Sequence, residues 1–101
     1  MYRIIWQYNV RPEAVDQFKK VYAADGVWTE FFRRSPDYVT TELYGDLNTP
    51  LRFITVDVWR NRAAYESFRK GNASDYVALD DACAVLIAHE RTLGVTEDGK
   101  E

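Results

Sequence analysis

Cysteine and histidine are almost absent from this chain of 101 residues, which holds one of each, Cys83 and His89. A single cysteine cannot form an intrachain disulfide, and it cannot supply a cysteine-rich structural zinc site. Nothing in the composition therefore indicates an oxidising compartment. We expect a cytoplasmic protein without a metal site.

Positive charge and long apolar runs are also scarce. The 13 lysines and arginines are outnumbered by 16 aspartates and glutamates, which gives a net charge of -3. Without a basic face to displace counterions from phosphate, the chain does not fit a nucleic-acid-binding protein. No stretch approaches the roughly 18 apolar residues of a membrane-spanning helix, and no basic segment followed by an apolar run begins the chain. The sequence predicts neither nucleic acid nor a membrane as a partner.

Aromatic side chains, by contrast, are abundant. Three tryptophans, seven tyrosines and five phenylalanines make up 15% of the residues. This is more ring surface than the core of a small monomer usually needs. We expect some of these rings to contact a partner or a small hydrophobic molecule.

The pattern of apolar residues predicts both strands and helices. Alternation predicts strands at about 2–10, 38–47, 51–59 and 87–95, and helical spacing predicts helices at about 12–25, 27–34 and 62–86, the last one broken near Gly71-Asn72. The order is β-α-β-β-α-β, which predicts a ferredoxin-like α+β fold with a four-stranded antiparallel sheet and helices on one face. We expect one domain over 1–96 and a frayed tail over 97–101.

The other face of such a sheet has no helices to cover it. Apolar residues occur on both sides of the predicted strands, and leaving them in water is unfavourable. A two-fold dimer that stacks sheet against sheet would bury this face in both subunits at once. The sequence therefore predicts a homodimer formed through the sheet face.

The third predicted strand runs directly into a helix and is the most informative stretch of the chain. Alternation places four mixed aromatic and polar residues on one of its faces: Phe53, Thr55, Asp57 and Trp59. An acid in the middle of a β-branched strand must be solvated, paired or functional. Pairing of Asp57 with Arg91, or with Arg52 of the partner subunit, is the favoured structural interpretation.

Seven short stretches spread over nearly the whole chain carry a family resemblance: YNVRPE at 8–13, GVW at 26–28, YVTTEL at 38–43, TVDVW at 55–59, AYESF at 64–68, YVALD at 76–80 and ERTLG at 90–94. They resemble the antibiotic-biosynthesis-monooxygenase-like domains of the dimeric α/β-barrel superfamily. The resemblance implies oxidation of polycyclic aromatic phenols by dioxygen without metal or flavin, because the substrate anion itself supplies the electrons. No cofactor is therefore expected.

The resemblance also suggests site residues. Trp59 and Tyr65 match a tryptophan and a tyrosine that contact substrate in the polyketide-quinone-forming members, while Thr55 stands where those members have asparagine. Haem-degrading members of the same fold match less well, because the position of their tryptophan looks like Phe68 here and the position of their histidine falls near Asp80. Without an axial imidazole there, haem degradation is not expected.

Two functional hypotheses follow. In the first, a homodimeric cofactor-independent monooxygenase acts on or binds a small aromatic compound in a cavity between sheet and helices. The residues expected to bind substrate are Tyr8, Trp28, Phe32, Thr55, Asp57, Trp59 and Tyr65, with His89 and Tyr65 as the candidate catalytic residues. In the second, the chain is a non-catalytic ligand-binding or structural homodimer, since no nucleophile elbow, phosphate loop or metal cluster is present.

Each of these residues also has an ordinary structural interpretation. Trp59 and Tyr65 fit core packing, and a lone histidine on a strand is more often exposed or structural. The aromatic segment with Trp28, Phe31 and Phe32 fits either a lid over the cavity or a seal for the open end of the core.

Overall fold

The computed structural model describes residues 1–98. The elements follow one another as β1 (Tyr2–Val10), η1 (Pro12–Ala14), α1 (Val15–Tyr22), α2 (Val27–Phe32), β2 (Tyr38–Gly45), β3 (Arg52–Trp59), α3 (Arg62–Gly71), α4 (Ala73–Cys83), η2 (Ala84–Leu86) and β4 (Ile87–Glu97). The predicted order of strands and helices is confirmed, although the first predicted helix divides into η1 and α1.

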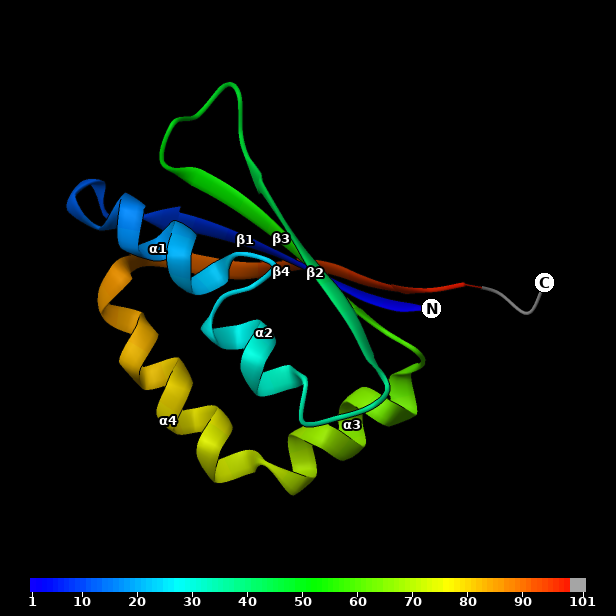
Figure 1. Cartoon of the computed structure of the whole chain (residues 1–101). Helices are drawn as coiled ribbons and strands as arrows, with labels where there is room; N and C mark the ends of the chain where they lie inside the picture. The colour runs from blue at the N-terminus through cyan, green and yellow to red at the C-terminus, as the bar shows by residue number, and fades with distance from the viewer. Residues whose placement is uncertain (99–101) are drawn as a thin grey trace.

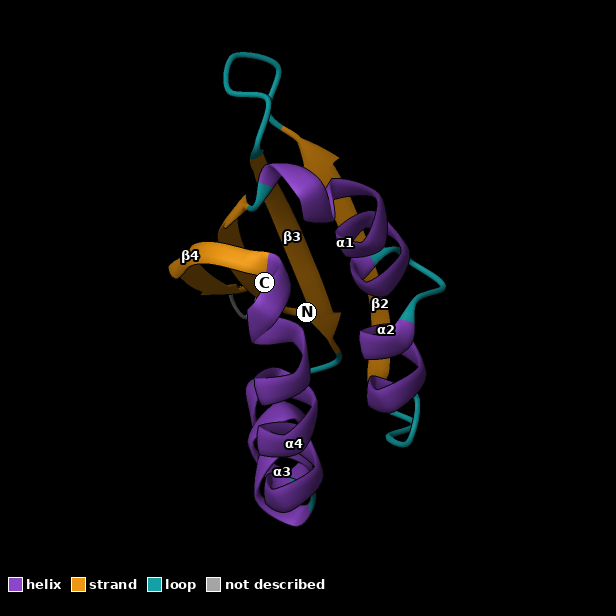
Figure 2. Ribbon diagram, turned by 90° about the vertical axis from the view of Figure 1, so that its left-hand side faces the viewer, coloured by secondary structure: helices purple, strands orange, loops and turns teal. Residues whose placement is uncertain are grey.

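The four strands form one antiparallel sheet in the order β2-β3-β1-β4. All helices lie on one face of this sheet, and the opposite face carries no helix (Figure 1, Figure 2). This is the ferredoxin-like α+β fold that the sequence predicts. Among residues 1–98, every helix is too short or too polar to cross a bilayer.

The core lies between the sheet and the helices and consists largely of aromatic rings. Phe18 of α1 and Trp59 of β3 are fully buried. Phe18 stacks on Tyr22 with ring centroids 4.3 Å apart, and Trp59 contacts Phe32 of α2 edge to face at 5.4 Å. Such pairs add stability beyond the burial of their area, so the rings fix how the helices sit on the sheet.

The side chains of two asparagines define the two ends of α3. Asn61 caps its start, because its Oδ1 accepts a hydrogen bond from the backbone N–H of Ala64 at 2.8 Å. Asn72 follows its end, and its Nδ2 donates to the carbonyl of Phe68 at 3.0 Å. The predicted break near Gly71-Asn72 is confirmed, and it turns α4 back toward β4.

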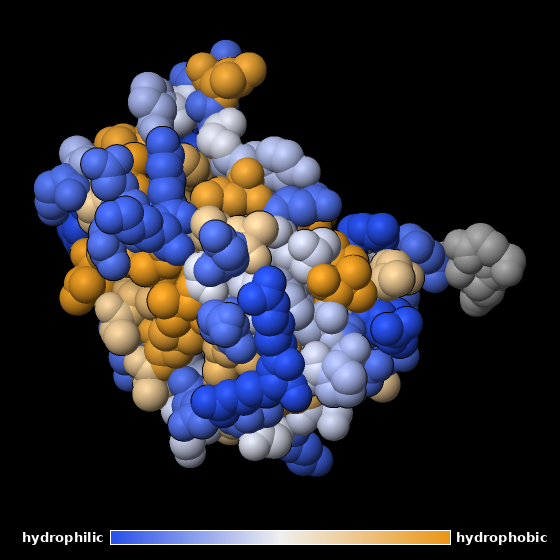
Figure 3. Space-filling view, in the orientation of Figure 1, coloured by the Kyte–Doolittle hydropathy of each residue, from blue (hydrophilic) through white to orange (hydrophobic). Residues whose placement is uncertain are grey.

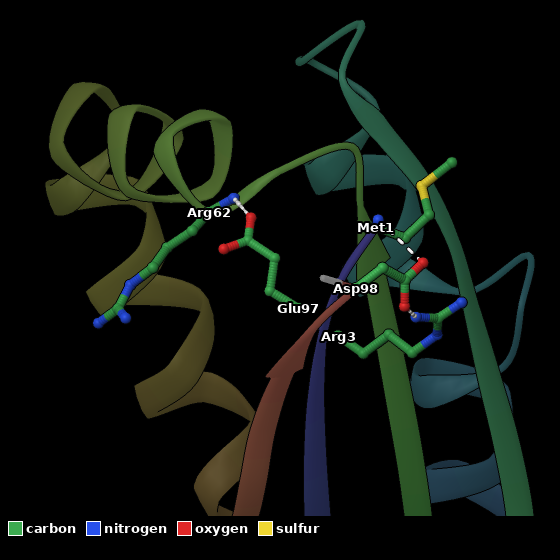
Figure 4. Close-up of polar contacts among 5 residues, drawn as sticks. All are labelled: Met1, Arg3, Arg62, Glu97 and Asp98. Carbon is green, nitrogen blue, oxygen red and sulfur yellow. Dashed lines mark hydrogen bonds and ion pairs between the residues drawn. The ribbon is translucent and has the colours of Figure 1, made fainter. Parts of the chain in front are cut away.

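The sheet extends further toward the C-terminus than the sequence predicts. The sequence predicts that the last strand ends near 95 and that the tail frays from 97, but Glu97 pairs with Tyr2 in the sheet. The Glu97 carboxylate accepts from the backbone N–H of Arg62 at 3.1 Å, while Asp98 forms ion pairs with the N-terminal ammonium at 3.2 Å and Arg3 at 3.0 Å (Figure 4). These contacts hold the strand end in place. The rest of the predicted tail, 99–101, lies outside the described residues.

The pairing register decides which residues of β4 face the helices. Glu90 pairs with Tyr8, whose side chain is buried on the helix side. His89 pairs with Asn9, and Arg91 pairs with Gln7, so these residues share the helix-free face. Register shifts at Ile5/Trp6 and Asn9/Val10 mark bulges in β4.

Candidate active site

A cavity of about 160 Å³ lies between the sheet and the helices. All four strands and all four α-helices contribute to its lining, which consists of Trp6, Tyr8, Tyr22, Trp28, Phe32, Thr41, Thr55, Asp57, Arg69, Tyr76, Asp80 and Glu90. The cavity therefore exists only once the complete fold has formed. Aromatic walls with a few polar groups are typical of a small-molecule site.

The walls of the cavity are aromatic rings that hold one another in place. Trp28 of α2 contacts Tyr76 of α4 edge to face at 5.2 Å and Tyr22 of α1 at 6.3 Å. Tyr22 in turn contacts Tyr8 of β1 at 4.9 Å. Because these rings brace each other across four elements, they present a preformed apolar surface to a planar ligand.

The buried polar part of the lining comes from β2, at one edge of the sheet, and from its neighbour β3. Thr41 of β2 is 4% exposed, Thr55 of β3 is 2% exposed and Asp57 of β3 is 8% exposed. The Thr41 hydroxyl donates a hydrogen bond to Asp57 Oδ1 at 2.8 Å. A carboxyl and two hydroxyls are thus buried beside the aromatic walls.

The expected pairing of Asp57 with an arginine is wrong within this chain. Asp57 forms no ion pair with any residue of the described part. The sheet itself separates the charges, because Asp57 faces the helices while Arg91 and Arg52 lie at positions of the opposite face.

Burial controls the protonation of the groups in the cavity. It raises the pKa of Asp57 to about 6, against the opposing effect of the hydrogen bond from Thr41. Burial also raises the pKa of Tyr8 well above its ordinary value, so this phenol stays neutral. Asp57 can therefore change its protonation state near neutral pH while the surrounding tyrosines keep their protons.

Three exposed charged residues, Arg69, Asp80 and Glu90, line the cavity at its solvent side. Arg69 of α3 is fixed there, because its guanidinium lies 3.8 Å from the ring centroid of Tyr76 and donates to the Tyr65 hydroxyl at 2.8 Å. The surface seen in Figure 3 alternates hydrophobic and charged groups over this helical side of the molecule. An arginine held against an aromatic ring gives the opening one fixed cation.

The structure brings five of the predicted binding residues together at this cavity: Tyr8, Trp28, Phe32, Thr55 and Asp57. Trp59 and Tyr65 lie beside it in the core instead. Trp59 is fully buried, and its ring contacts Tyr65 at 5.4 Å and Phe68 at 5.2 Å. Tyr65 reaches the cavity only through its hydrogen bond with Arg69. The aromatic segment of α2 is buried, which matches a seal rather than an exposed lid.

His89 lies away from the cavity. Its position is exposed and shares the helix-free face with Asn9, so the sheet stands between its imidazole and the cavity of the same chain. The expectation that His89 serves as the proton acceptor in this cavity is corrected by this placement. The residue of β4 that lines the cavity is Glu90, which lies on the helix side of the sheet.

Sequence reasoning missed several lining residues, among them Trp6, Tyr22, Thr41, Arg69, Tyr76 and Glu90. A signal existed for two of them. Trp6 alternates with Tyr8 on the same strand face, and Thr41 stands opposite Asp57 once the hairpin of β2 and β3 is aligned. The helical residues gave no such signal, because their approach to the sheet depends on tertiary packing. Within residues 1–98, no three side chains of the metal-binding types cluster as a site for an ion.

Taken together, the ferredoxin-like sheet and the aromatic cavity define a small α+β domain built around a site for a small molecule. A profile of the antibiotic biosynthesis monooxygenase family matches residues 1–75. The chain belongs to the antibiotic biosynthesis monooxygenase family. No curated protein matches the sequence.

Solved structures share the fold at low sequence identity. SnoaB from Streptomyces nogalater, a cofactor-independent oxygenase studied as its N63A mutant, is 17% identical with a TM-score of 0.77, over 99% of this chain and 94% of that chain. A Deinococcus radiodurans protein provisionally named an antibiotic biosynthesis monooxygenase is 16% identical with a TM-score of 0.75, over 100% of this chain and 95% of its own. These likenesses establish the fold.

Proposed function

We propose that this protein is a cofactor-independent oxygenase that converts a small, electron-rich phenol into a quinone. The observation that carries the proposal is the cavity itself, in which aromatic walls surround the buried carboxyl of Asp57. Family membership and the oxygenase activity in the name of SnoaB support the reaction class. Within the lining, Tyr8, Trp28 and Phe32 would hold the ring, and Thr55 and Asp57 would face its polar substituents.

The size of the cavity limits the substrate. A closed apolar cavity of on the order of 150 Å³ accommodates one benzene ring. The cavity here has about 160 Å³, so it would enclose one ring and leave a second ring near Arg69 and Glu90. We therefore propose a phenol of one ring or two fused rings with a hydrogen on the ring carbon opposite its hydroxyl, which is smaller than the polycyclic phenols that the family resemblance implied.

The reaction would need no redox group from the protein. A phenolate donates electrons to dioxygen, and one oxygen atom forms a bond to the ring carbon opposite the hydroxyl. The O–O bond then breaks, and the phenolic proton and the hydrogen from that ring carbon leave with the second oxygen as water. The protein would bind the ring, exclude water and hold the phenolic proton.

The same proposal includes a homodimer with one cavity in each subunit. The helix-free face carries Ile5, Ile54, Val56 and Tyr44 at adjoining positions of three strands, and each of them is at least partly exposed in the single chain. A second copy of this sheet would cover these side chains without touching the helical side where the cavity lies. A cytoplasmic location, which rests on the scarcity of cysteine, stays a prediction.

The test is oxygen consumption with phenols of graded size. We expect uptake with 1,5-dihydroxynaphthalene, in which the ring carbon opposite each hydroxyl carries a hydrogen, and slower uptake with the three-ring compound anthrone. Isotopically labelled dioxygen should place one labelled atom in the quinone and the other in water, with one dioxygen consumed per quinone. Uptake that yields hydrogen peroxide and no label in the product would contradict oxygenation. Ring compounds that bind without any uptake would favour the non-catalytic binding protein.

A substitution in the wall links the activity to this cavity. Replacement Tyr76→Leu removes a ring that contacts Trp28, and we expect kcat/KM for dihydroxynaphthalene to fall roughly three- to tenfold. Val77→Leu is the matched control, because Val77 is the neighbouring residue of α4 and is 57% exposed. Equal rates for both variants would place the reaction elsewhere.

A further inference from the structure

Asp57 is the one buried charged side chain among the described residues that line the cavity. It is 8% exposed, whereas Arg69, Asp80 and Glu90 are exposed to solvent. No cation among residues 1–98 forms an ion pair with it. A buried carboxyl without a counter-ion destabilises a fold, so its presence at a ligand cavity indicates a functional role.

Asp57 ends a chain of hydroxyl groups that runs into the protein. Thr41 Oγ1 lies 2.8 Å from Asp57 Oδ1 and 2.6 Å from the Tyr38 hydroxyl. The Tyr38 hydroxyl lies 3.4 Å from Thr29 Oγ1, which donates to the carbonyl of Ala23 at 3.2 Å. Among residues 1–98, the side-chain hydrogen bond to this carboxyl engages only Oδ1. The other oxygen is left for a group in the cavity.

This chain of hydroxyls can satisfy both protonation states of Asp57. When the carboxyl is ionised, Tyr38 donates to Thr41 and Thr41 donates to Asp57. When Asp57 holds a proton on Oδ1, each hydroxyl rotates, and the donors run from Asp57 through Thr41 and Tyr38 to Thr29 and its carbonyl acceptor. Hydroxyl hydrogens rotate freely, so the switch requires no movement of heavy atoms.

We propose that Asp57 is the catalytic base of this cavity and that Thr41 and Tyr38 are positioning residues that orient its carboxyl. The assignment rests on the oxygenase function proposed above. The phenolic O–H would donate to the free oxygen of Asp57, which takes the proton as the phenolate gives electrons to dioxygen. When the O–O bond breaks, Asp57 returns this proton to the departing oxygen, which leaves as water with the hydrogen from the ring carbon.

Other titratable groups surround Asp57 without replacing it. The groups that face it from the packed elements are Tyr8 of β1, Tyr22 of α1, Tyr38 of β2, Arg69 of α3, Tyr76 and Asp80 of α4, and Glu90 of β4, while α2 contributes only Trp28 and Phe32. Burial raises the pKa of the tyrosines, so they remain neutral near pH 7. The burial that raises the pKa of Asp57 to about 6 suits a base that works near neutrality.

Binding of a phenol and its methyl ether tests the contact without turnover. Wild-type protein should bind 1-naphthol roughly tenfold or more tightly than 1-methoxynaphthalene under anaerobic conditions, because only the phenol donates to a carboxylate. Asp57→Leu should bind both equally, while the control Asp81→Asn, at an exposed position of α4, should keep the preference. Equal affinities in the wild type would overturn the assignment, and binding of neither compound would overturn the proposed function as well.

The pH profile tests catalysis. For dihydroxynaphthalene, kcat/KM should rise with pH through an apparent pKa near 6, and Asp57→Asn should remove this limb and lower the rate roughly a hundredfold or more. Thr41→Val keeps the carboxyl of Asp57 and removes its hydrogen-bond donor, so the rise of kcat/KM should move to higher pH.

If Asp57→Asn gave the same pH profile as the wild type, the assignment of Asp57 as the base would be overturned, while the oxygenase function would stand. A rate that falls with His89→Ala instead would make His89 the base. A preference for 1-naphthol without oxygen uptake would overturn both.

Discussion

At the scale of single residues, Asp57 best shows what alternation can and cannot predict. The pattern of β3 correctly groups Phe53, Thr55, Asp57 and Trp59 on one face, and all four are buried. Burial follows from the strand period of two, which the sequence displays directly. The partner of Asp57 does not follow from it, because Thr41 comes into reach only through the register of the hairpin.

Asp57 should make stability depend on pH in a defined direction. Its pKa of about 6 in the folded state exceeds the value of 3.8 that applies when it is exposed, so the folded state binds the proton more tightly. The free energy of unfolding should therefore fall as pH rises from about 4 to about 6, by up to roughly 3 kcal/mol. Below about pH 4 the carboxyl is protonated in both states and this contribution no longer changes.

Replacement Asp57→Asn should remove this component and make the protein more stable than the wild type at about pH 7.5. Urea unfolding of both proteins between about pH 4 and pH 8 measures it, with Asp81→Asn as the control for loss of a carboxyl at an exposed site. The prediction would be wrong if the free energy of unfolding of Asp57→Asn changed with pH in the same way as that of the wild type.

At the scale of elements, bulges explain why His89 misses the cavity. Ile87 is buried and pairs with Val10, so strict alternation would also place His89 on the helix side. The structure instead pairs His89 with Asn9, which leaves Ala88 as an extra residue in β4. One extra residue moves every following side chain to the opposite face. A bulge of this kind has no mark in the sequence of β4, so its effect was not predictable.

The connection between α1 and α2 requires a residue without a side chain. A Cβ on Gly26 would overlap the carbonyl oxygens of Lys20 and Val21, which are backbone atoms that cannot rotate away. Gly71, the last residue of α3, has open space around its Cα. The two glycines therefore form a matched pair for substitution.

We expect Gly26→Ala to lower the free energy of unfolding by about 1–3 kcal/mol, because the end of α1 or the start of α2 must shift. Gly71→Ala should cause no loss and up to about 1 kcal/mol of gain, since alanine favours the helix. Thermal or urea unfolding of both variants measures the difference. A Gly26→Ala protein as stable as Gly71→Ala would show that the turn tolerates a side chain.

At the scale of the whole molecule, the fold and the place of the cavity between sheet and helices were predictable, but its complete lining was not. The order of elements follows from local periodicity, and only one common arrangement accommodates it. The cavity draws side chains from eight elements, so its lining depends on how the helices pack on the sheet. This is why Trp59 and Tyr65, suggested by spacing along the chain, lie beside the cavity and Tyr76 lies in its wall.

The helix-free face predicts the assembly. Light scattering at micromolar concentration should give a molecular mass twice the 11.8 kDa of one chain. Val56 lies on β3 opposite Ile5 and Glu42, at the centre of this face, and Val56→Asp would place a charge in the interface. We expect this variant to be a folded monomer, while Val77→Asp on the exposed side of α4 stays dimeric. A monomeric wild type would rule out the proposed sheet-to-sheet contact.

If Asp57 is the base, a phenol must bind in the cavity with its hydroxyl on Asp57. A crystal structure of the anaerobic protein with 1-naphthol tests it most directly. We expect the hydroxyl to lie within hydrogen-bond distance of the free carboxyl oxygen of Asp57, with the ring between Trp28 and Tyr76. A ligand bound outside this cavity, or inside it with the hydroxyl turned away from Asp57, would contradict the account.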